Sequence, residues 1–439
     1  MNRAKVKNQI KHKEIVSDKT EAANQIAAIN VIKKKLLGKR LSYPEIFTLM
    51  DELSHERLSP ILTTYFVAAG FREGFSENEL YYLTRAMSET GTKLHFKGIV
   101  ADKHSTGGLA GTRTTMILVP IVAAAGFKIP KNSSRAITTP AGTADTMEVL
   151  SRVTFTPKEI EKIVNKVGGC IVWGGHLGLA PADDIIIQVE QPLSFESFDK
   201  IIISIMAKKV ASGATHLVLD IPVGQTLKIR HFQDAELIEK KFVFLARKFG
   251  IKLSVDINQT LEPAGHGVGP ALEARDVLKV LNQTPDRPFV LEAKALRLAG
   301  KLLDLCLFDK KKKATPGEGE ELARSILASG KALAKMKEII KIQGGNPDIE
   351  VNHIKIGQFK YEAPSTHRGT ITAFNNLNLT SVAKILGAPS DKQAGIYLER
   401  RLDEKVDKGD ILCILYSSDK WRLTEAIETL KNLPIYSVS

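Results

Sequence analysis

The residues of this chain best suited to chemistry lie together in the stretch 102–108, which reads Asp-Lys-His-Ser-Thr-Gly-Gly. Apolar residues 98–101 precede it and a helix-compatible run over 114–125 follows, which predicts a strand, a glycine-rich turn and a helix N-terminus. Free backbone N–H groups and the positive end of the helix dipole attract an anion at such a place. Lys103 adds a positive charge, and Gly108 lets the backbone approach a ligand closely. The stretch therefore predicts a phosphate-binding loop.

His104 is the one group in this loop that can transfer a proton near neutral pH. Taken alone, a Gly-Gly pair after Ser-Thr is just as typical of an ordinary turn. The loop is not a P-loop, since the G-x-x-x-x-G-K-[ST] spacing is absent. A second stretch favours the phosphate-binding interpretation.

That second stretch is 133–148, Ser-Ser-Arg-Ala-Ile-Thr-Thr-Pro-Ala-Gly-Thr-Ala-Asp-Thr-Met-Glu. It resembles the signature segment of the thymidine/pyrimidine-nucleoside phosphorylase family, and 103–108 resembles the phosphate-binding loop of that family. The resemblance extends over roughly residues 25 to 435, with further similar segments at 180–183, 204–209 and 267–274. Within the family, the segments 134–138, 172–175 and 220–224 are more similar to the AMP phosphorylase branch than to the thymidine enzymes. That branch carries an extra N-terminal domain, which we expect this chain to lack.

The resemblance implies phosphorolysis, in which inorganic phosphate attacks C1′ of a nucleoside or nucleoside 5′-monophosphate. The products are the free base and a pentose 1-phosphate or pentose 1,5-bisphosphate. Phosphate needs no activating base at neutral pH, so the enzyme must hold it, stabilise an oxocarbenium-like centre and offset charge on the departing base. The protein would then be a pentosyltransferase, with phosphate as co-substrate and no cofactor.

The resemblance assigns roles residue by residue. His104 and Glu196 are the predicted proton donors, although Glu196 and Lys228 are equally well explained as surface charges. Ser134 and Arg135 are placed to meet a 5′-phosphate, and Arg135 is equally suited to a structural ion pair. The predicted phosphate ligands are Lys103, Ser105, Gly108, Thr114, Ser133 and Thr143, and the predicted substrate contacts are Ser134, Arg135, Ala136, Ile137, Thr138, Ser204, Lys208 and Lys228.

The sequence departs from the family pattern at two places, one of which concerns the base of the substrate and the other a metal ion. The arginine that the family places near the base is missing, and Gln188 and Gln191 occupy its neighbourhood, which leaves the preferred base open. Ala110 stands where pyrimidine-nucleoside phosphorylases have a glycine in a cation-supported loop, so we predict no metal.

The surrounding pattern predicts an α/β protein: a small all-helical domain, a larger domain with a mixed, mainly parallel sheet, and a C-terminal β-rich (α+β) subdomain. The helix after Pro60 is apolar on most sides, so we expect it to be buried in a bundle. The predicted domains are a basic disordered tail over 1–20, a helical domain over 21–95 with 183–212, an α/β domain over 96–182 with 213–340, and the C-terminal subdomain over 348–439. In this family the active site would be a cleft between the helical and α/β domains.

Composition limits the function classes. The net charge of +13 suits anionic substrates or nucleic acid, but no aromatic interleaving accompanies the lysine runs, so nucleic acid is not favoured. Three scattered cysteines and the lack of a long apolar run indicate a cytoplasmic protein without a membrane span. We expect a homodimer formed through the helical domain. The alternatives are a non-catalytic basic binding protein with the same fold and an anthranilate-phosphoribosyltransferase-type enzyme, whose acidic magnesium motif is absent.

Overall fold

The computed structural model describes residues 22–137, 139–190, 197–311, 315 and 317–439. The chain divides into two compact units. One, the helical unit, contains residues up to Leu94 together with Gly178–Ser212 and Lys240–Phe249; the other, the α/β unit, contains the remainder. The class is α/β, as predicted, and the C-terminal α+β subdomain lies within the α/β unit.

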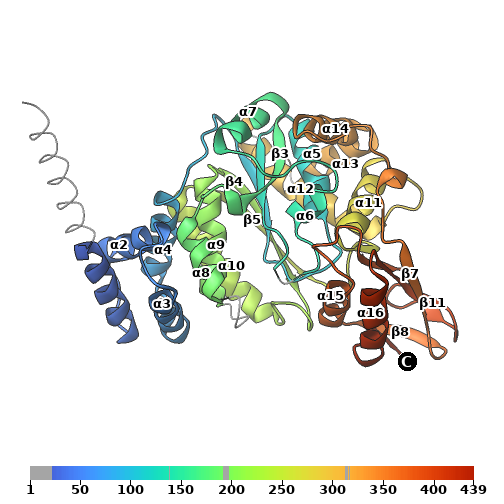
Figure 1. Ribbon diagram of the computed structural model, residues 1–439. Coiled ribbons are helices and arrows are strands. Elements are labelled where there is room, and N and C mark those ends of the chain that lie inside the picture. The colour runs from blue at the N-terminus through green and yellow to red at the C-terminus, as the bar shows by residue number, and fades with distance from the viewer. Residues whose placement is uncertain (1–21, 138, 191–196, 312–314, 316) are drawn as a thin grey trace, which may run out of the picture. The chain divides into compact units, whose positions relative to one another are not determined.

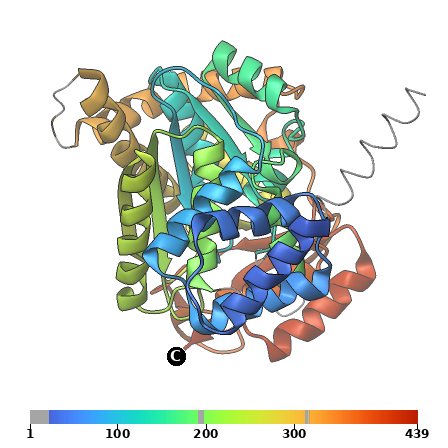
Figure 2. The same ribbon diagram turned by 90° about the vertical axis from the view of Figure 1, so that its left-hand side faces the viewer.

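Two helices of the helical unit, α2 and α4, have N-terminal caps formed by residues close to one another in the sequence. Glu45 accepts a hydrogen bond from the backbone N–H of Ser42, and Glu79 accepts one from that of Ser76, so a capping box forms at the start of α2 and of α4. Gly38, at a φ of 70°, follows the first helix. The helices α2–α4 (blue) are visible in Figure 2. The bounds are 22–36, α2 Tyr43–Ser54, α3 Pro60–Glu73, α4 Glu77–Glu89, α8 Pro181–Glu190 and α9 Phe198–Ala211.

Helix α3 differs from its prediction. Only Thr63, Phe66, Ala69 and Gly70 are buried on it. Ile61 is 70% exposed and Tyr65 54% exposed, so the described part of this chain does not cover the apolar face after Pro60. The helix packs against α8, but the expectation that it is buried in a bundle was wrong for its exposed face, because an apolar composition does not show which surface covers a helix.

The α/β unit is built on parallel strands. β1 pairs with β4 and β4 with β5, while β2 pairs with β3, and a single bridge from Val100 to Lys128 connects the two groups in parallel. The resulting order is β3-β2-β1-β4-β5 (Figure 1). The bounds are β1 Ala101–Ser105, β2 Ile129–Ser133, β3 Gly169–Trp173, β4 His216–Val223 and β5 Lys252–Gln259.

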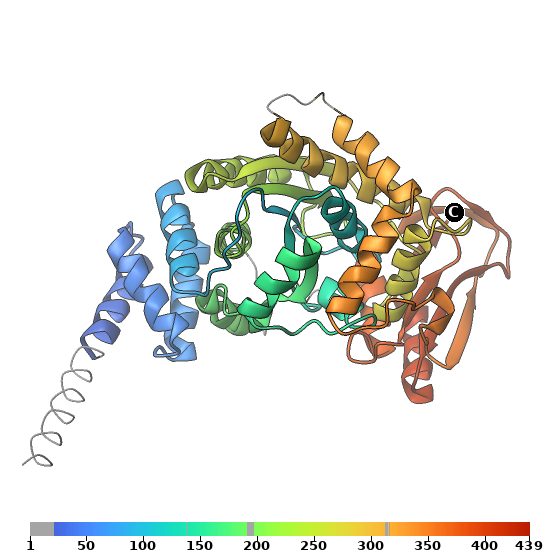
Figure 3. The ribbon, with the colours of Figure 1, turned by 90° about the horizontal axis from the view of Figure 1, so that it is seen from above.

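Helices connect and cover these strands. α5 is apolar on all sides after its first two residues and buried from Thr114 to Ala123, as is typical of a helix at the centre of a large domain. The chain forms two helices, α13 and α14, between Glu318 and Ile342, because Gly330 adopts a φ of 75° between them. α12, α13 and α14 pack in series (gold to orange in Figure 3). The bounds are α5 Thr114–Ala124, α6 Thr143–Met147, α7 Pro157–Val167, η1 Gly174–His176, α10 Phe232–Phe249, α11 Pro270–Leu281, α12 Phe289–Lys311, α13 Glu318–Ala328, α14 Lys331–Ile342 and η3 Val351–His353.

The C-terminal subdomain has two antiparallel sheets and two helices around one apolar core. β6 comes from the α/β segment and pairs with β9, so the subdomain is joined to the rest of the unit by backbone hydrogen bonds. The expected turn over 405–410 includes the short strand β10. The bounds are β6 Gly267–Val268, β7 Phe359–Pro364, β8 Gly369–Phe374, α15 Asn376–Ile385, β9 Gly395–Leu398, β10 Lys405–Val406, β11 Ile411–Ser417, α16 Lys420–Asn432 and β12 Tyr436–Val438. Within the described part of the chain, no helix has both the length and the apolarity needed to cross a membrane.

Candidate active site

Polar residues lie at or near the carboxyl ends of β1, β2, β4 and β5, whereas β3 ends at Trp173. Ser105 at the end of β1 is in register with Asp220 on β4, which is in register with Asp256 on β5. On the other side, Ser133 at the end of β2 pairs with Trp173 at the end of β3. Ligands of open parallel sheets bind at this carboxyl edge. The edge therefore brings the two sequence motifs together.

Lys103 lies on β1 itself, and not in a turn after it as the sequence predicted. The correction arises because β1 runs through Ser105, two residues beyond Lys103. The Lys103 side chain is buried, with its Nζ 3.7 Å from Asp220, which also lies 3.3 Å from Lys294. Burial lowers the pKa of Lys103 to about 8; Asp220 opposes this shift, whereas Lys294 and Arg113 favour it. A bound anion would favour the charged ammonium, so this site is suited to phosphate.

Two buried hydroxyls, those of Thr114 and Ser133, suit a ligand. Thr114 starts α5 and Ser133 ends β2. Among the described residues, neither the Oγ1 atom of Thr114 nor the Oγ atom of Ser133 has a hydrogen-bond partner. Buried hydroxyls are normally paired, so an anion that accepts from both would satisfy them. Both are predicted phosphate ligands.

The loop between β1 and α5 requires glycine. Gly107 and Gly108 both have a φ of 83°. A Cβ atom on Gly108 would lie 2.8 Å from Cγ of Lys228, so a side chain there would displace that lysine. Lys228, a predicted substrate contact, thus lies directly against the phosphate loop. The Ser105 hydroxyl accepts a 3.4 Å hydrogen bond from the Gly107 N–H.

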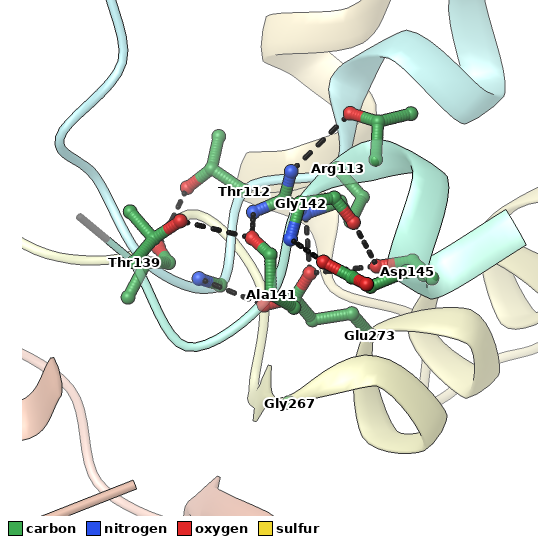
Figure 4. Close-up of polar contacts among 12 residues, drawn as sticks. Thr112, Arg113, Thr139, Ala141, Gly142, Asp145, Gly267 and Glu273 are labelled. Atoms are coloured by element: carbon green, nitrogen blue, oxygen red, sulfur yellow. Dashed lines mark hydrogen bonds and ion pairs between the residues drawn. The ribbon is translucent and has the colours of Figure 1, made fainter. Parts of the chain in front are cut away.

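Arg113 connects the phosphate loop to the signature segment (Figure 4). Its guanidinium donates to the Thr143 hydroxyl at 3.3 Å and to the Ala141 carbonyl at 2.8 Å, and it forms an ion pair with Glu273 on α11. Glu273 also accepts from the Gly111 N–H and from the Thr146 hydroxyl. Burial raises the pKa of Glu273, an effect that Arg113 opposes. This buried pair fixes Thr143 relative to the loop.

The rest of the signature segment is held by acidic residues. Arg135 pairs with Glu148 at 2.6 Å and with Asp145 at 3.0 Å, and it stacks over Trp173 at 4.8 Å. The Glu148 hydrogen bond raises the pKa of Arg135. The Ala136 N–H donates to Asp145 at 2.7 Å. Arg135 therefore forms structural ion pairs, which is one of the two roles that the sequence left open for it; the other is binding a 5′-phosphate. Ser134 and Ile137 are exposed, and Thr138 lies outside the described residues.

The helical unit contains its own polar cluster. The Ser204 hydroxyl donates to Asp183 at 2.6 Å, and Lys208, one turn later on α9, lies 2.9 Å from Asp183 and 3.6 Å from Asp184. Burial opposes a charge on Lys208, but these two carboxylates raise its pKa. The structure thus brings Ser204 and Lys208 together, as their helical spacing predicted.

Of the two predicted proton donors, His104 is among the residues that the structure describes and Glu196 is not. His104 lies half-buried on β1, and strand alternation places it on the opposite face from Lys103 and Ser105. Glu196 lies outside the described residues, as does Gln191, whereas Gln188 is exposed on α8.

Sequence reasoning missed several supporting residues. Asp220 and Glu273 lie within motifs that resemble the family, and Asp220 follows an apolar run, which was an available signal. The roles of Arg113 and Asn376 could not be predicted from the sequence pattern, because their partners Glu273 and Gly108 are 160 and 268 residues away in the chain. Such contacts depend on tertiary structure alone.

The comparisons with known proteins match these features. The α/β domain of the glycosyl transferase family matches residues 97–333, its helical bundle domain matches 29–91, and the pyrimidine nucleoside phosphorylase C-terminal domain matches 370–437. An AMP phosphorylase from Thermofilum pendens is 44% identical over 93% of this chain and 78% of its own. The chain belongs to the family of AMP and thymidine phosphorylases. It is a pentosyltransferase of that family.

Further relatives carry names from the same family. An AMP phosphorylase from Methanocaldococcus jannaschii is 41% identical over 94% of this chain and 80% of its own. A putative thymidine phosphorylase from Legionella pneumophila is 39% identical over 93% and 77%. Among solved structures, the anthranilate phosphoribosyltransferase of Thermus thermophilus has a TM-score of 0.59 at 19% identity, covering 71% of this chain and 99% of its own. At that identity the likeness supports the shared fold alone. Nothing in these findings supports a non-catalytic protein.

Proposed function

We propose that this enzyme catalyses the phosphorolysis of nucleoside 5′-monophosphates, with AMP as the first candidate, giving the free base and a pentose 1,5-bisphosphate. The observation that carries the proposal is the buried Lys103 on β1, together with the buried hydroxyls of Thr114 and Ser133, which have no hydrogen-bond partner among the described residues. The choice of a monophosphate rests on the AMP phosphorylases among the relatives.

In the proposed reaction, Lys103, Ser105, Thr114, Ser133 and Thr143 hold inorganic phosphate below the sugar. Their contribution is positioning and electrostatic, because phosphate is already nucleophilic at neutral pH. A neutral Lys103 would lose its attraction for phosphate, so the bound anion and the protonated lysine stabilise each other. The base-side roles of His104, Glu196, Ser204, Lys208 and Lys228 stay predictions.

A pyrimidine nucleoside is the second candidate substrate, and one observation favours it. Arg135, the residue predicted to meet a 5′-phosphate, is engaged by both Asp145 and Glu148. A 5′-phosphate would have to compete with two carboxylates for that guanidinium. The Legionella relative with the thymidine phosphorylase name is also similar over nearly the whole chain.

Base release from a substrate panel separates these candidates. We expect AMP, and at lower rates CMP or UMP, to release base only when phosphate is present, whereas thymidine and uridine do not react. Release from thymidine or uridine alone would instead establish the nucleoside phosphorylase. If no compound of the panel released base in a phosphate-dependent way, the proposed function would be wrong.

We further propose that two copies associate through the helical unit. Its helix 22–36 and α3 expose large apolar side chains, a pattern typical of an interface. The exposed fractions are 61% for Ile26, 45% for Leu36, 70% for Ile61, 54% for Tyr65 and 45% for Phe71.

Light scattering after size-exclusion chromatography tests this association. The wild-type chain should elute with twice the protomer mass, and the double variant Ile61→Glu/Tyr65→Glu should elute as a folded monomer because two charges would be buried at the interface. Trp421, on α16 of the C-terminal subdomain, is also an exposed aromatic residue, so Trp421→Glu is the matched control and should elute like the wild-type chain. A wild-type monomer, or a dimer that persists in the double variant, would contradict the proposal.

A further inference from the structure

Asn376, the first residue of α15 in the C-terminal subdomain, reaches into the phosphate loop. Its side-chain Nδ2 donates to the Gly108 carbonyl at 2.6 Å, and its Oδ1 accepts from the Ala110 N–H at 3.0 Å. The residue is 5% exposed. One carboxamide thus binds both a donor and an acceptor of the backbone, two residues apart, in the middle of the loop.

Only a carboxamide of this length fits these contacts. An amide side chain offers a donor and an acceptor on neighbouring atoms, whereas a carboxylate only accepts and a lysine only donates. Since Gly108 and its neighbour Gly107 both adopt a φ of 83°, the loop has few intrinsic restraints of its own. The two hydrogen bonds supply restraint where the backbone would approach an anion.

Further contacts from the same subdomain surround this one. The backbone N–H of Asn376 donates to the Thr226 hydroxyl at 3.2 Å, two residues before Lys228. Lys384, also on α15, donates to the Ile137 carbonyl at 3.1 Å. Lys392 pairs with Glu148 at 3.0 Å. The subdomain therefore contacts the phosphate loop, the Lys228 segment and the signature segment.

We propose that Asn376 is a positioning residue that holds the phosphate loop in its binding conformation, so that the C-terminal subdomain sets the affinity for the phosphate co-substrate. The inference rests on the proposed phosphorolysis. Asn376 acts through the backbone of Gly108 and Ala110. Its loss should therefore weaken phosphate binding and leave nucleotide binding largely unchanged.

The test compares Asn376→Ala with Asn375→Ala. The Asn375 side chain caps α15 by accepting from the N–H groups of Leu377 and Asn378, which lie on that helix and not in the phosphate loop. Asn375→Ala therefore weakens the same helix without releasing the loop. We expect Asn376→Ala to raise the phosphate KM about tenfold to a hundredfold while the nucleotide KM changes less than about twofold, because a displaced loop loses orientation. Asn375→Ala should match wild type in both constants.

Asn376→Asp provides a second variant of nearly the same shape. Its carboxylate still accepts from the Ala110 N–H, but it repels the Gly108 carbonyl and adds a negative charge beside the anion. We expect a larger rise in the phosphate KM than for Asn376→Ala.

The thermal shift that inorganic phosphate induces in each variant gives a readout without turnover. It should shrink for both Asn376 variants and persist for Asn375→Ala. If both Asn376 variants kept the wild-type phosphate KM and thermal shift, or if Asn375→Ala raised the KM equally, the inference would be wrong. These outcomes leave the proposed function intact, because that function fails only when the wild-type enzyme shows no phosphate-dependent base release.

Discussion

Replacing Lys103 with alanine is expected to lower phosphate-dependent base release about a hundredfold to a thousandfold, the loss typical of removing one preorganised charge-stabilising group. Lys103 is a buried cation in the middle of β1, and its Nζ lies 3.7 Å from Asp220. The variant should still fold, because Asp220 keeps its contacts with Lys294 and Asn258. Steady-state rates at saturating nucleotide and varied phosphate measure the effect.

The affinity for phosphate should also depend on pH, because the charge of Lys103 does. Lys103 is charged below its folded pKa of about 8 and neutral above it. Phosphate affinity should therefore fall as pH rises through about 8. Lys103→Arg should lack this fall because a guanidinium stays charged, and it controls for the ionisation of phosphate itself.

The stability of the ligand-free protein should change in the opposite direction. Because the folded pKa of Lys103 lies below its ordinary value of 10.5, the unfolded chain binds more protons between these pH values. The Lys103 contribution to the free energy of unfolding thus rises from pH about 8 toward 10.5. Lys103→Met removes the buried charge and should melt at the wild-type temperature or above while lacking activity. A Lys103→Met variant that keeps full activity would remove this lysine from the mechanism.

Replacing Arg113 with alanine is expected to lower the free energy of unfolding by about 3 to 5 kcal/mol, the cost of leaving a buried charge without its partner. The ion pair with Glu273 is nearly inaccessible to solvent, and burial already raises the pKa of that carboxyl. The same change frees the Thr143 hydroxyl and the Ala141 carbonyl. Denaturant unfolding measures the stability, and the rate at saturating phosphate measures the loss of positioning.

Arg152 provides the matched control for this change. Its pair with Glu159 at 3.2 Å is exposed on both sides, so Arg152→Ala should lower the free energy of unfolding far less than Arg113→Ala does. The double variant Arg113→Met/Glu273→Gln should regain part of the stability, because no charge is then left unpaired. Equal stabilities of the Arg113 and Arg152 variants would show that the buried pair does not hold the two motifs together.

The local pattern of the sequence predicted most elements near the site. In the sequence, short apolar runs at 170–173, 216–221 and 253–257 coincide with β3, β4 and β5, and the helix-compatible run over 114–125 is α5. The predictions of β3 and β4 succeed because strands buried on both faces are largely apolar along their length. β5 lies at the edge of the sheet and is only partly buried, and its alternating apolar residues show the strand instead. The phosphate and signature motifs are likewise local in sequence.

The same reasoning placed β1 too early and missed β2. Both strands carry polar side chains where they are buried: Asp102 and Lys103 on β1, and Lys131 and Asn132 on β2. Lys131 is tolerated there because Asp102 on the neighbouring strand lies 3.4 Å away. A window along one strand cannot show that its charge has a partner on the next.

The sequence by itself determined the family, the element types around the two motifs, and the residues suited to bind phosphate. Only the tertiary structure decided that Ser105, Ser133 and Asp220 lie toward one edge of the sheet, through the parallel register of their strands. It also decided which residues hold the loop, since Arg113 pairs with Glu273 and Asn376 with Gly108 across long separations in the chain. The physical reason is that each of these side chains is buried against groups brought near only by folding, and its chemistry depends on those groups.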